Sequence, residues 1–420
     1  MINHPVHRSQ LANGITVLTI ANPTADIVSG RFFIPAGSRW ETSEQAGLAQ
    51  LLTSVLMKGT ERLSALEIAD RVESVGAGLG ADTTTDYIKL SLKTVKSDLV
   101  DIFKLAGEIL RTPSFPAAQI ELERKLILQA IKSQTEQPFN NAYRQLRTAL
   151  YGEHPYARST LGTATTMGQI TRQDLVDYHQ THIRPDRLII SLAGRITPAE
   201  AIDLVTEVFG DWQIPEIAPP LLTAQSVTTT PQYQVEQQST QQAIVMLGYL
   251  APAIHDPDCI APAIHDPDCI ALKLIDSYLS NGMSSRLFVE LREKRGLAYD
   301  VSAFYPTRLD TSHFAVYMGT AASNTQIAVS GLRAEVDRLC LEPLSAAELQ
   351  TTKDKLLGQY ALGKQTNGQL AQTYGWYELL GLSVDFDQQF STAIGQLTST
   401  GLQTVAEKYL SEPYVSIVSP

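Results

Sequence analysis

The chain has 420 residues, 44% hydrophobic and 18% charged, a composition that excludes an intrinsically disordered protein. Its 33 basic and 44 acidic side chains give a net charge of −11, which makes nucleic-acid binding unfavourable. No apolar run approaches the roughly 20 residues of a membrane-spanning helix. The polar segment 1–14 lacks the apolar core of a secretory signal, so we expect a cytoplasmic protein, or a periplasmic one if the chain starts at a processed end.

Strands and helices follow one another through the first half of the chain in a pattern that predicts an α+β domain. The predicted strands span residues 15–20, 28–35, 86–93 and 187–194. The predicted helices span residues 43–57, 65–75, 96–110, 171–182 and 198–209, with a helical region at 116–150 interrupted near Pro138. The glycine-rich segment 76–80 follows a helix and lacks a phosphate-loop Lys, so we interpret it as a helix-to-strand turn.

The second half repeats this order of elements. Its predicted strands span residues 242–250, 313–319 and 414–418, and its predicted helices span residues 271–280, 284–294, 324–339 and 345–381. Residues 214–231 contain four prolines and a Ser/Thr cluster, which is typical of a linker. We therefore expect an N-terminal domain at 1–213 and a C-terminal domain at 232–420.

Two pairs of segments indicate that the halves are related by duplication. Leu51–Thr60 resembles Leu274–Met283 with an offset of 223 residues, and Phe115–Ile131 resembles Leu344–Tyr360 with an offset of 229. Matches in the same order along the chain, at a spacing too long for a solenoid, predict two homologous domains.

A ten-residue segment, APAIHDPDCI, occurs twice in tandem at 251–260 and 261–270. Its repeated His, Asp and Cys residues could form a metal-binding loop, but two loop copies provide no preset ligand geometry. One copy suffices to join the preceding strand to the next helix, so we expect the other copy to be an exposed excursion.

Residues 46–60, AGLAQLLTSVLMKGT, resemble the zinc motif of the pitrilysin/insulinase family of peptidases, G-L-A-H-x-L-E-H-x-L-x-K-G-T. In that family the two His residues bind zinc and the Glu activates the zinc-bound water. Here Gln50, Thr53 and Ser54 occupy those three positions, and Ala130, within ERKLILQAI, replaces the family's third ligand, a Glu. The resemblance therefore implies a degenerate zinc site that holds no metal in this chain.

Residues 284–302, SSRLFVELREKRGLAYDVS, resemble the same family's S-S-R-L-F-x-x-L/I-R-E-x-x-G-L-x-Y segment. Active members carry there an Arg and a Tyr, matched by Arg292 and Tyr299, that face the zinc site. The resemblance implies that Tyr299 stabilises the developing charge on the scissile carbonyl and that Arg292 binds peptide carbonyls. A core Tyr and a surface Arg are the alternative interpretation. Arg286 and Arg295 are interpreted as structural or surface residues.

The family fold implies two homologous α+β domains, each a mostly antiparallel sheet of about six strands with helices on one face, forming a clam-like shell. Peptides bind there as an added strand at a sheet edge. The chain is similar to the zinc-less α subunit of mitochondrial processing peptidase and to bacterial paired members. That similarity implies a heterodimer in which a partner with an intact H-x-x-E-H supplies zinc and peptides are the substrate. We expect no activity from the chain alone, and a homodimer in isolation stays open.

Two other functions remain possible from the sequence. The chain could be a scaffold or peptide-binding member of the family with no peptidase role, or a self-sufficient hydrolase, which would need a zinc site that the sequence does not place. His179 and His182 are spaced for metal binding, but no acidic or Cys ligand accompanies them. A surface or capping role is therefore favoured for these two histidines.

Overall fold

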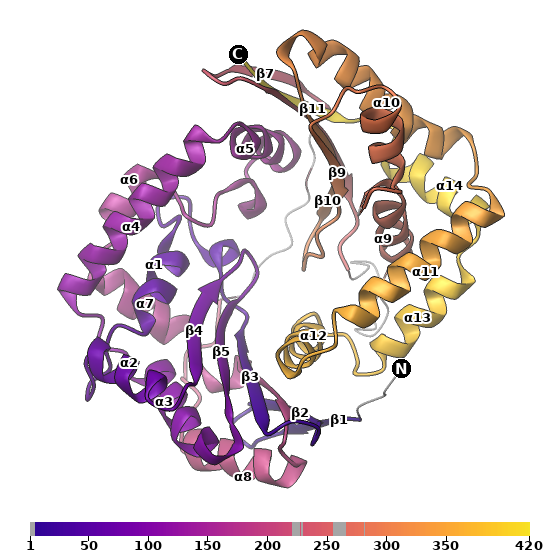
Figure 1. The fold of residues 1–420 in the computed structure, drawn as a ribbon. Coiled ribbons are helices and arrows are strands. Elements are labelled where there is room, and N and C mark those ends of the chain that lie inside the picture. Colours follow the sequence, from indigo (N-terminus) through magenta and orange to yellow (C-terminus); the bar gives the residue numbers. More distant parts are fainter. Residues whose placement is uncertain (1–4, 221–226, 228–229, 255–265, 281) are drawn as a thin grey trace. The chain divides into compact units, whose positions relative to one another are not determined.

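The computed structural model describes residues 5–220, 227, 230–254, 266–280 and 282–420 (Figure 1). It consists of two compact units. The first unit contains Met1–Ile131, Ser159–Thr223 and Ala361–Val384, and the second contains Lys132–Arg158, Ala224–Tyr360 and Asp385–Pro420. No helix in the described part of the chain is both long and apolar enough to cross a membrane.

The first unit contains a six-stranded sheet in the order β1-β2-β6-β3-β5-β4. Its strands are β1 (Val6–Gln10), β2 (Thr16–Ala21), β3 (Ile27–Ile34), β4 (Gly78–Thr83), β5 (Ile88–Val95) and β6 (Ile189–Gly194). Only the β2–β6 pair is parallel. The segment interpreted as a turn at 76–80 therefore lies partly in β4, which corrects that interpretation.

The second unit repeats this topology with five described strands in the order β7-β11-β8-β10-β9. They are β7 (Tyr233–Gln237), β8 (Ala243–Ala251), β9 (Asp300–Phe304), β10 (Ser312–Thr320) and β11 (Tyr414–Ser419). The order matches β2-β6-β3-β5-β4, and the equivalent pair, β7–β11, is again the parallel one. The prediction of two homologous α+β domains is confirmed, and β1 is an addition to the first of them.

One face of the first unit's sheet is covered by α1 (Leu48–Leu56), α2 (Ala65–Glu73), α3 (Leu99–Arg111) and α8 (Pro198–Phe209). Helix α7 (Arg172–His182) packs on α1, and α4 (Ala117–Glu136) and α6 (Ala164–Gln169) add buried side chains to the same core. Side chains alternate between the faces of a strand, so Phe32 faces these helices and Phe33 faces away. The Phe32 ring packs against Phe103 of α3 and Phe209 of α8, with centroid distances of 5.3 and 6.2 Å.

The second unit has the equivalent helices, α9 (Pro267–Leu279), α10 (Thr325–Leu341), α11 (Ala346–Leu362), α13 (Phe386–Gln396) and α14 (Ser399–Tyr409). A π-helix at Phe288–Glu293 lies between α9 and β9. The helical region expected at 345–381 is therefore two helices, α11 and α12 (Asn367–Leu379).

The other face of each sheet is covered by a helix from the opposite half of the sequence. Helix α5 (Pro138–Tyr151) packs on β8 and β11, and α12 packs on β3 and β6. Glycines permit both approaches: a Cβ at Gly375 of α12 would lie 2.2 Å from the Phe33 ring, and one at Gly248 of β8 would lie 2.7 Å from Leu146. The compact units thus exchange helices across the expected boundary at 214–231, part of which lies outside the described residues.

The tandem repeat lies mostly outside the described residues, but its two ends meet. The backbone N–H of Asp266 donates a hydrogen bond of 3.1 Å to the carbonyl oxygen of Ile254. Asp266 also caps α9, because its side chain accepts a hydrogen bond from the Asp268 N–H. Removal of residues 255–264 deletes ten residues, the length of one copy, and keeps both partners of this hydrogen bond in the chain.

We expect a variant lacking residues 255–264 to fold with an unfolding free energy within about 1 kcal/mol of the full chain. A shorter loop costs slightly less closure entropy, and the capped start of α9 is retained. Urea unfolding followed by circular dichroism measures the difference. A variant that is insoluble or several kcal/mol less stable would show that the second copy contributes to the fold.

Candidate functional site

Helix α1 carries three of the four degenerate zinc positions, and a buried carboxylate holds its N-terminus. Glu41 accepts hydrogen bonds from the backbone N–H groups of Gly47, at 2.9 Å, and Ala49, at 2.7 Å. A negative charge at a helix N-terminus is stabilising. Gly47 has φ +98°, and a Cβ there would lie 2.7 Å from the Leu161 carbonyl oxygen, so only glycine fits.

Two of the residues that follow α1 in the segment Lys58-Gly59-Thr60 also form structural contacts. Lys58 forms an ion pair of 3.0 Å with Glu123 of α4. The Thr60 hydroxyl donates a 2.6 Å hydrogen bond to Glu108 of α3 and accepts one from the Leu63 N–H. Lys58 and Glu123 belong to the two motifs whose alignment places Ser54 and Ala130, and their ion pair joins those two motifs in the structure.

Arg124, next to Glu123, is a buried cation that closes the C-terminus of α6. Its guanidinium donates to the carbonyl oxygens of Met167 and, at 2.7 Å, Ile170. Free carbonyls at a helix C-terminus need such donors, and a cation there is stabilised by the helix dipole. The residues that frame the motif therefore have structural roles that do not depend on a metal.

The four degenerate positions do not fit a zinc ion. The Gln50 amide donates a long hydrogen bond, 3.4 Å, to the Ser54 hydroxyl. The buried Thr53 hydroxyl donates to the backbone carbonyls of Ala49 and Gln50, each at 3.0 Å, and Ala130 is exposed on α4. A neutral amide, two hydroxyls and a methyl group are not zinc ligands. Within the described ranges, no three His, Cys, Asp or Glu residues are grouped to hold a metal.

His179 and His182 are buried structural residues of α7. His179 Nε2 lies 2.8 Å from the Leu110 carbonyl oxygen and His182 packs against the rings of Tyr178 and Trp40. Burial lowers the pKa of each imidazole from 6.5 to about 4, and for His182 the charges of nearby arginines add to this effect. Both side chains are buried, so the surface or capping role favoured from the sequence is wrong: the two histidines pack inside the first unit.

These two histidines should make the protein less stable in acid. Between pH 6.5 and 4 the unfolded chain binds protons that the folded chain excludes, so the unfolding free energy falls as the pH falls through that window. We expect a loss of about 2 kcal/mol per histidine between pH 7 and 5. Urea unfolding should show a shallower pH dependence for His179→Gln and His182→Gln, while His7→Gln, on the surface, should leave it unchanged. Equal slopes in all variants would contradict this origin.

Arg292 and Tyr299 are both solvent exposed. Arg292 lies in the π-helix, where the Lys294 N–H donates to the Val289 carbonyl oxygen at 3.0 Å, and its guanidinium lies 4.9 Å from the centre of the Phe288 ring. Tyr299 precedes β9; its backbone N–H bonds to Gly319, while its side chain is 62% exposed. Tyr299 is therefore not a core residue, and π-helical turns occur frequently at functional sites.

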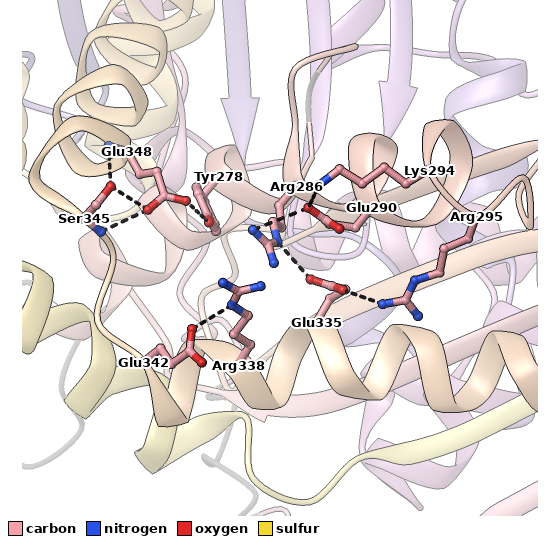
Figure 2. Close-up of polar contacts among 10 residues, drawn as sticks. All are labelled: Tyr278, Arg286, Glu290, Lys294, Arg295, Glu335, Arg338, Glu342, Ser345 and Glu348. Atoms are coloured by element: carbon pink, nitrogen blue, oxygen red, sulfur yellow. Dashed lines mark hydrogen bonds and ion pairs between the residues drawn. The ribbon is translucent and has the colours of Figure 1, made fainter.

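Arg286 and Arg295 anchor this segment to α10, as Figure 2 shows. Both pair with the buried Glu335: Arg286 Nε at 2.8 Å and Arg295 at 3.2 Å. Lys294 forms a further ion pair with Glu290 at 2.8 Å. The structural role predicted for Arg286 and Arg295 agrees with these contacts, which hold both ends of the π-helix on the domain while Arg292 points to solvent.

The sequence interpretation missed a basic sheet face in the first unit. Lys89 and Lys93 of β5 and Arg31 of β3 lie on the face opposite the main core, where the Arg31 guanidinium donates to the carbonyl oxygens of Gly30, at 2.8 Å, and Leu92, at 3.3 Å. The alternating pattern DYIKLSLK contained the signal for the two lysines, because it places them on the same face. Their alignment with Arg31 required the β3–β5 register.

Comparison with known proteins assigns the chain to a family. The model "Insulinase (Peptidase family M16)" matches residues 16–164, and the model "Peptidase M16 inactive domain" matches residues 169–356. Uncharacterized zinc proteases of Mycobacterium leprae and Streptomyces coelicolor are each 26% identical. The first match covers 98% of this chain and 92% of the relative, and the second covers 99% and 90%.

Two solved structures share the fold. A peptidase M16 inactive domain from Pseudomonas fluorescens superposes with a TM-score of 0.90 at 22% identity, covering 99% of this chain and 98% of that one. A protease from Helicobacter pylori gives a TM-score of 0.89 at 20% identity, covering 99% and 100%. With the two family models matched in sequence over most of its length, the chain belongs to the insulinase family of peptidases, family M16.

Proposed function

We propose that this chain is the zinc-less subunit of a heterodimeric metallopeptidase. The proposal rests on a contrast within the chain. The residues on either side of the zinc motif keep structural contacts, whereas all four positions that hold the metal ligands and the general base in the family are lost. Arg292 and Tyr299, in contrast, are solvent exposed on a segment that ion pairs hold to α10. A scaffold requires only the framing contacts, whereas two exposed side chains on an anchored segment are suited to act on a bound peptide.

In the proposed complex a homologous partner supplies zinc and the general base. The Tyr299 phenol donates a hydrogen bond to the scissile carbonyl oxygen as that oxygen gains negative charge, and the Arg292 guanidinium binds a neighbouring peptide carbonyl. The substrate is an extended peptide or unfolded protein, bound as an added strand. This chain contributes part of the peptide chamber and no metal.

Reconstitution with the homologous subunit that carries an intact H-x-x-E-H tests the proposal. Each purified chain alone should be nearly inactive on a quenched fluorescent peptide, and an equimolar mixture should be active and elute as one complex. Stoichiometric zinc and turnover in this chain alone would contradict the proposal. Formation of a complex that cleaves the peptide no faster than the partner alone would favour the scaffold function instead.

A further inference from the structure

A half-buried arginine of the second unit lacks a negatively charged partner. Arg147 of α5 donates a hydrogen bond of 3.2 Å from Nη1 to the Arg158 carbonyl oxygen, whereas its buried Nε has no hydrogen-bond partner. Within the described ranges no Asp or Glu forms an ion pair with it. By contrast, Arg124, Arg184 and Arg286, whose side chains are at most 13% exposed, each form an ion pair with a carboxylate at 2.6–3.2 Å. A charge that loses water without gaining such a partner is costly, so Arg147 is an uncompensated cation.

The surroundings of Arg147 are positively charged. Burial lowers the pKa of Arg147, and the nearby cation Arg308 lowers it further. The same two arginines act on His313, which is fully buried, and burial together with their charges holds the pKa of His313 well below its usual value of 6.5. Asp310, a carboxylate of the same region, lies 3.3 Å from His154 Nε2. The imidazole of His313 is therefore neutral, and the charge of Arg147 is not offset at this position.

Two tyrosines of α5 keep the Arg147 guanidinium in place. Its centre lies 4.9 Å from the centre of the Tyr143 ring, one helical turn before it, and Tyr151 lies one turn after it. The Tyr143 hydroxyl lies 3.0 Å from Nε2 of His313, and the Tyr151 hydroxyl lies 2.8 Å from Nδ1 of the same ring. A guanidinium that lies on an aromatic ring uses its face and leaves the N–H groups on its edge available for hydrogen bonds.

The edge of a guanidinium is a donor fork for oxyanions. Adjacent N–H groups, here those on Nε and Nη2 of Arg147, can donate two parallel hydrogen bonds to the oxygens of a carboxylate or a phosphate. A bound oxyanion would also offset the charges of Arg147 and Arg308, which interact with it more strongly in a half-buried region than in bulk water. A neutral ligand would accept the hydrogen bonds but leave the charge uncompensated.

We infer that Arg147 forms a binding site for one oxyanion, a phosphate or a carboxylate, and that the positive charge of Arg308 adds to the attraction. The site lies within the second unit and does not depend on the proposed peptidase function. Free phosphate and the carboxylate side chain of a bound peptide both carry this chemistry, and the experiments below distinguish the two sources.

Calorimetric titration of phosphate into the full chain, at an ionic strength held constant with NaCl, tests the inference. We expect one phosphate per chain, and Arg147→Met should weaken binding about tenfold or more, because two charge-assisted hydrogen bonds are lost. Arg338→Met is the control: it removes an exposed arginine of α10, on the opposite face of the sheet, with the same change of net charge, and should alter the Kd less than twofold. No binding to the parent chain, or equal losses in the two variants, would overturn the inference.

A conservative variant tests the fork itself and guards against a folding defect of Arg147→Met. Arg147→Lys keeps the charge but presents no pair of parallel donors, so its affinity for phosphate should lie between those of the parent and of Arg147→Met. An affinity equal to that of the parent would contradict bidentate binding by Arg147.

Competition identifies the source of the oxyanion. Two short peptides that differ only by Glu or Gln at one position are added to the phosphate-bound chain. Displacement of phosphate by the Glu peptide alone assigns the site to peptide carboxylates, and displacement by neither assigns it to a free anion; both results keep the oxyanion site. Equal displacement by the Glu and Gln peptides would contradict a site that selects negative charge.

Discussion

Replacing Tyr299 with Phe should lower kcat of the reconstituted heterodimer by about 10²-fold or more, with little change in assembly. A phenol that donates to the developing oxyanion stabilises the transition state more than the substrate, and loss of one such donor costs about 10²–10³ in kcat. The substitution removes one oxygen from a side chain that is 62% exposed, so the fold should not change. Arg292→Ala should raise KM and lower kcat, because the guanidinium would position the peptide as well as polarise it.

Matched controls separate this role from a general surface effect. Tyr233 of β7 is an exposed tyrosine of the same unit, and Arg144 of α5 is an arginine whose ion pair with Glu236 is exposed. Tyr233→Phe and Arg144→Ala should leave kcat and KM within about twofold, as expected for groups remote from the reacting bond. If Tyr299→Phe and Arg292→Ala were equally silent, the chain would not contribute to catalysis.

Replacing Arg124 with Met should destabilise the first unit by about 2–4 kcal/mol. Methionine keeps the aliphatic stem, but the carbonyl oxygens of Met167 and Ile170 lose a charged donor at a buried helix terminus. Lys353 does the same in the second unit: its ammonium donates to Gly395 at 2.8 Å and Leu397 at 2.6 Å, at the end of α13. Lys353→Met should therefore destabilise that unit by a similar amount.

Urea unfolding of both variants and of the surface control Lys125→Met measures these losses. The control should stay within about 0.5 kcal/mol of the parent chain, as surface substitutions usually do. A stability of Arg124→Met equal to that of the control would show that this framing residue is not kept for structural reasons. That result would contradict the explanation that structural contacts preserved the residues around the zinc motif after its metal ligands were lost.

The central strands could be predicted from the sequence and the outer strands could not. The missed strands, β1, β4, β7 and β9, are the edges of the two sheets. Central strands are buried on both faces or alternate strongly, whereas edge strands pair on one side only and hold polar residues and glycine, as in VHRSQ and GLGADT. Their strand conformation comes from pairing with a neighbour, which local periodicity does not report.

The packing of α5 in the second unit and of α12 in the first could not be predicted from the sequence either. Helical periodicity predicted a helical region at 116–150 with an interruption near Pro138, and α5 begins at that proline. The pattern says which face of a helix is apolar but not which sheet it covers. The need for glycine at 375 and 248 could not be predicted, because it depends on the close approach of Phe33 and Leu146 in the folded protein.

The candidate site was predictable to the extent that it follows motifs. The framing residues of the two motifs placed the four degenerate positions, Gln50, Thr53, Ser54 and Ala130. The structure shows the contacts that hold those framing residues. The roles of Arg292 and Tyr299 stay predictions, supported by their exposure and by the anchoring of their segment to Glu335. The basic sheet face formed by Arg31, Lys89 and Lys93 depends on the register between β3 and β5, so no single stretch of sequence contained it.

An experimental structure of the heterodimer with an uncleaved peptide, obtained with the partner's general base removed, is the most direct test of the account. The account predicts the Tyr299 hydroxyl within hydrogen-bonding distance, about 2.5–3.0 Å, of the scissile carbonyl oxygen, with zinc bound only by the partner. A Tyr299 hydroxyl that faces bulk solvent, or zinc coordinated by residues of this chain, would contradict it.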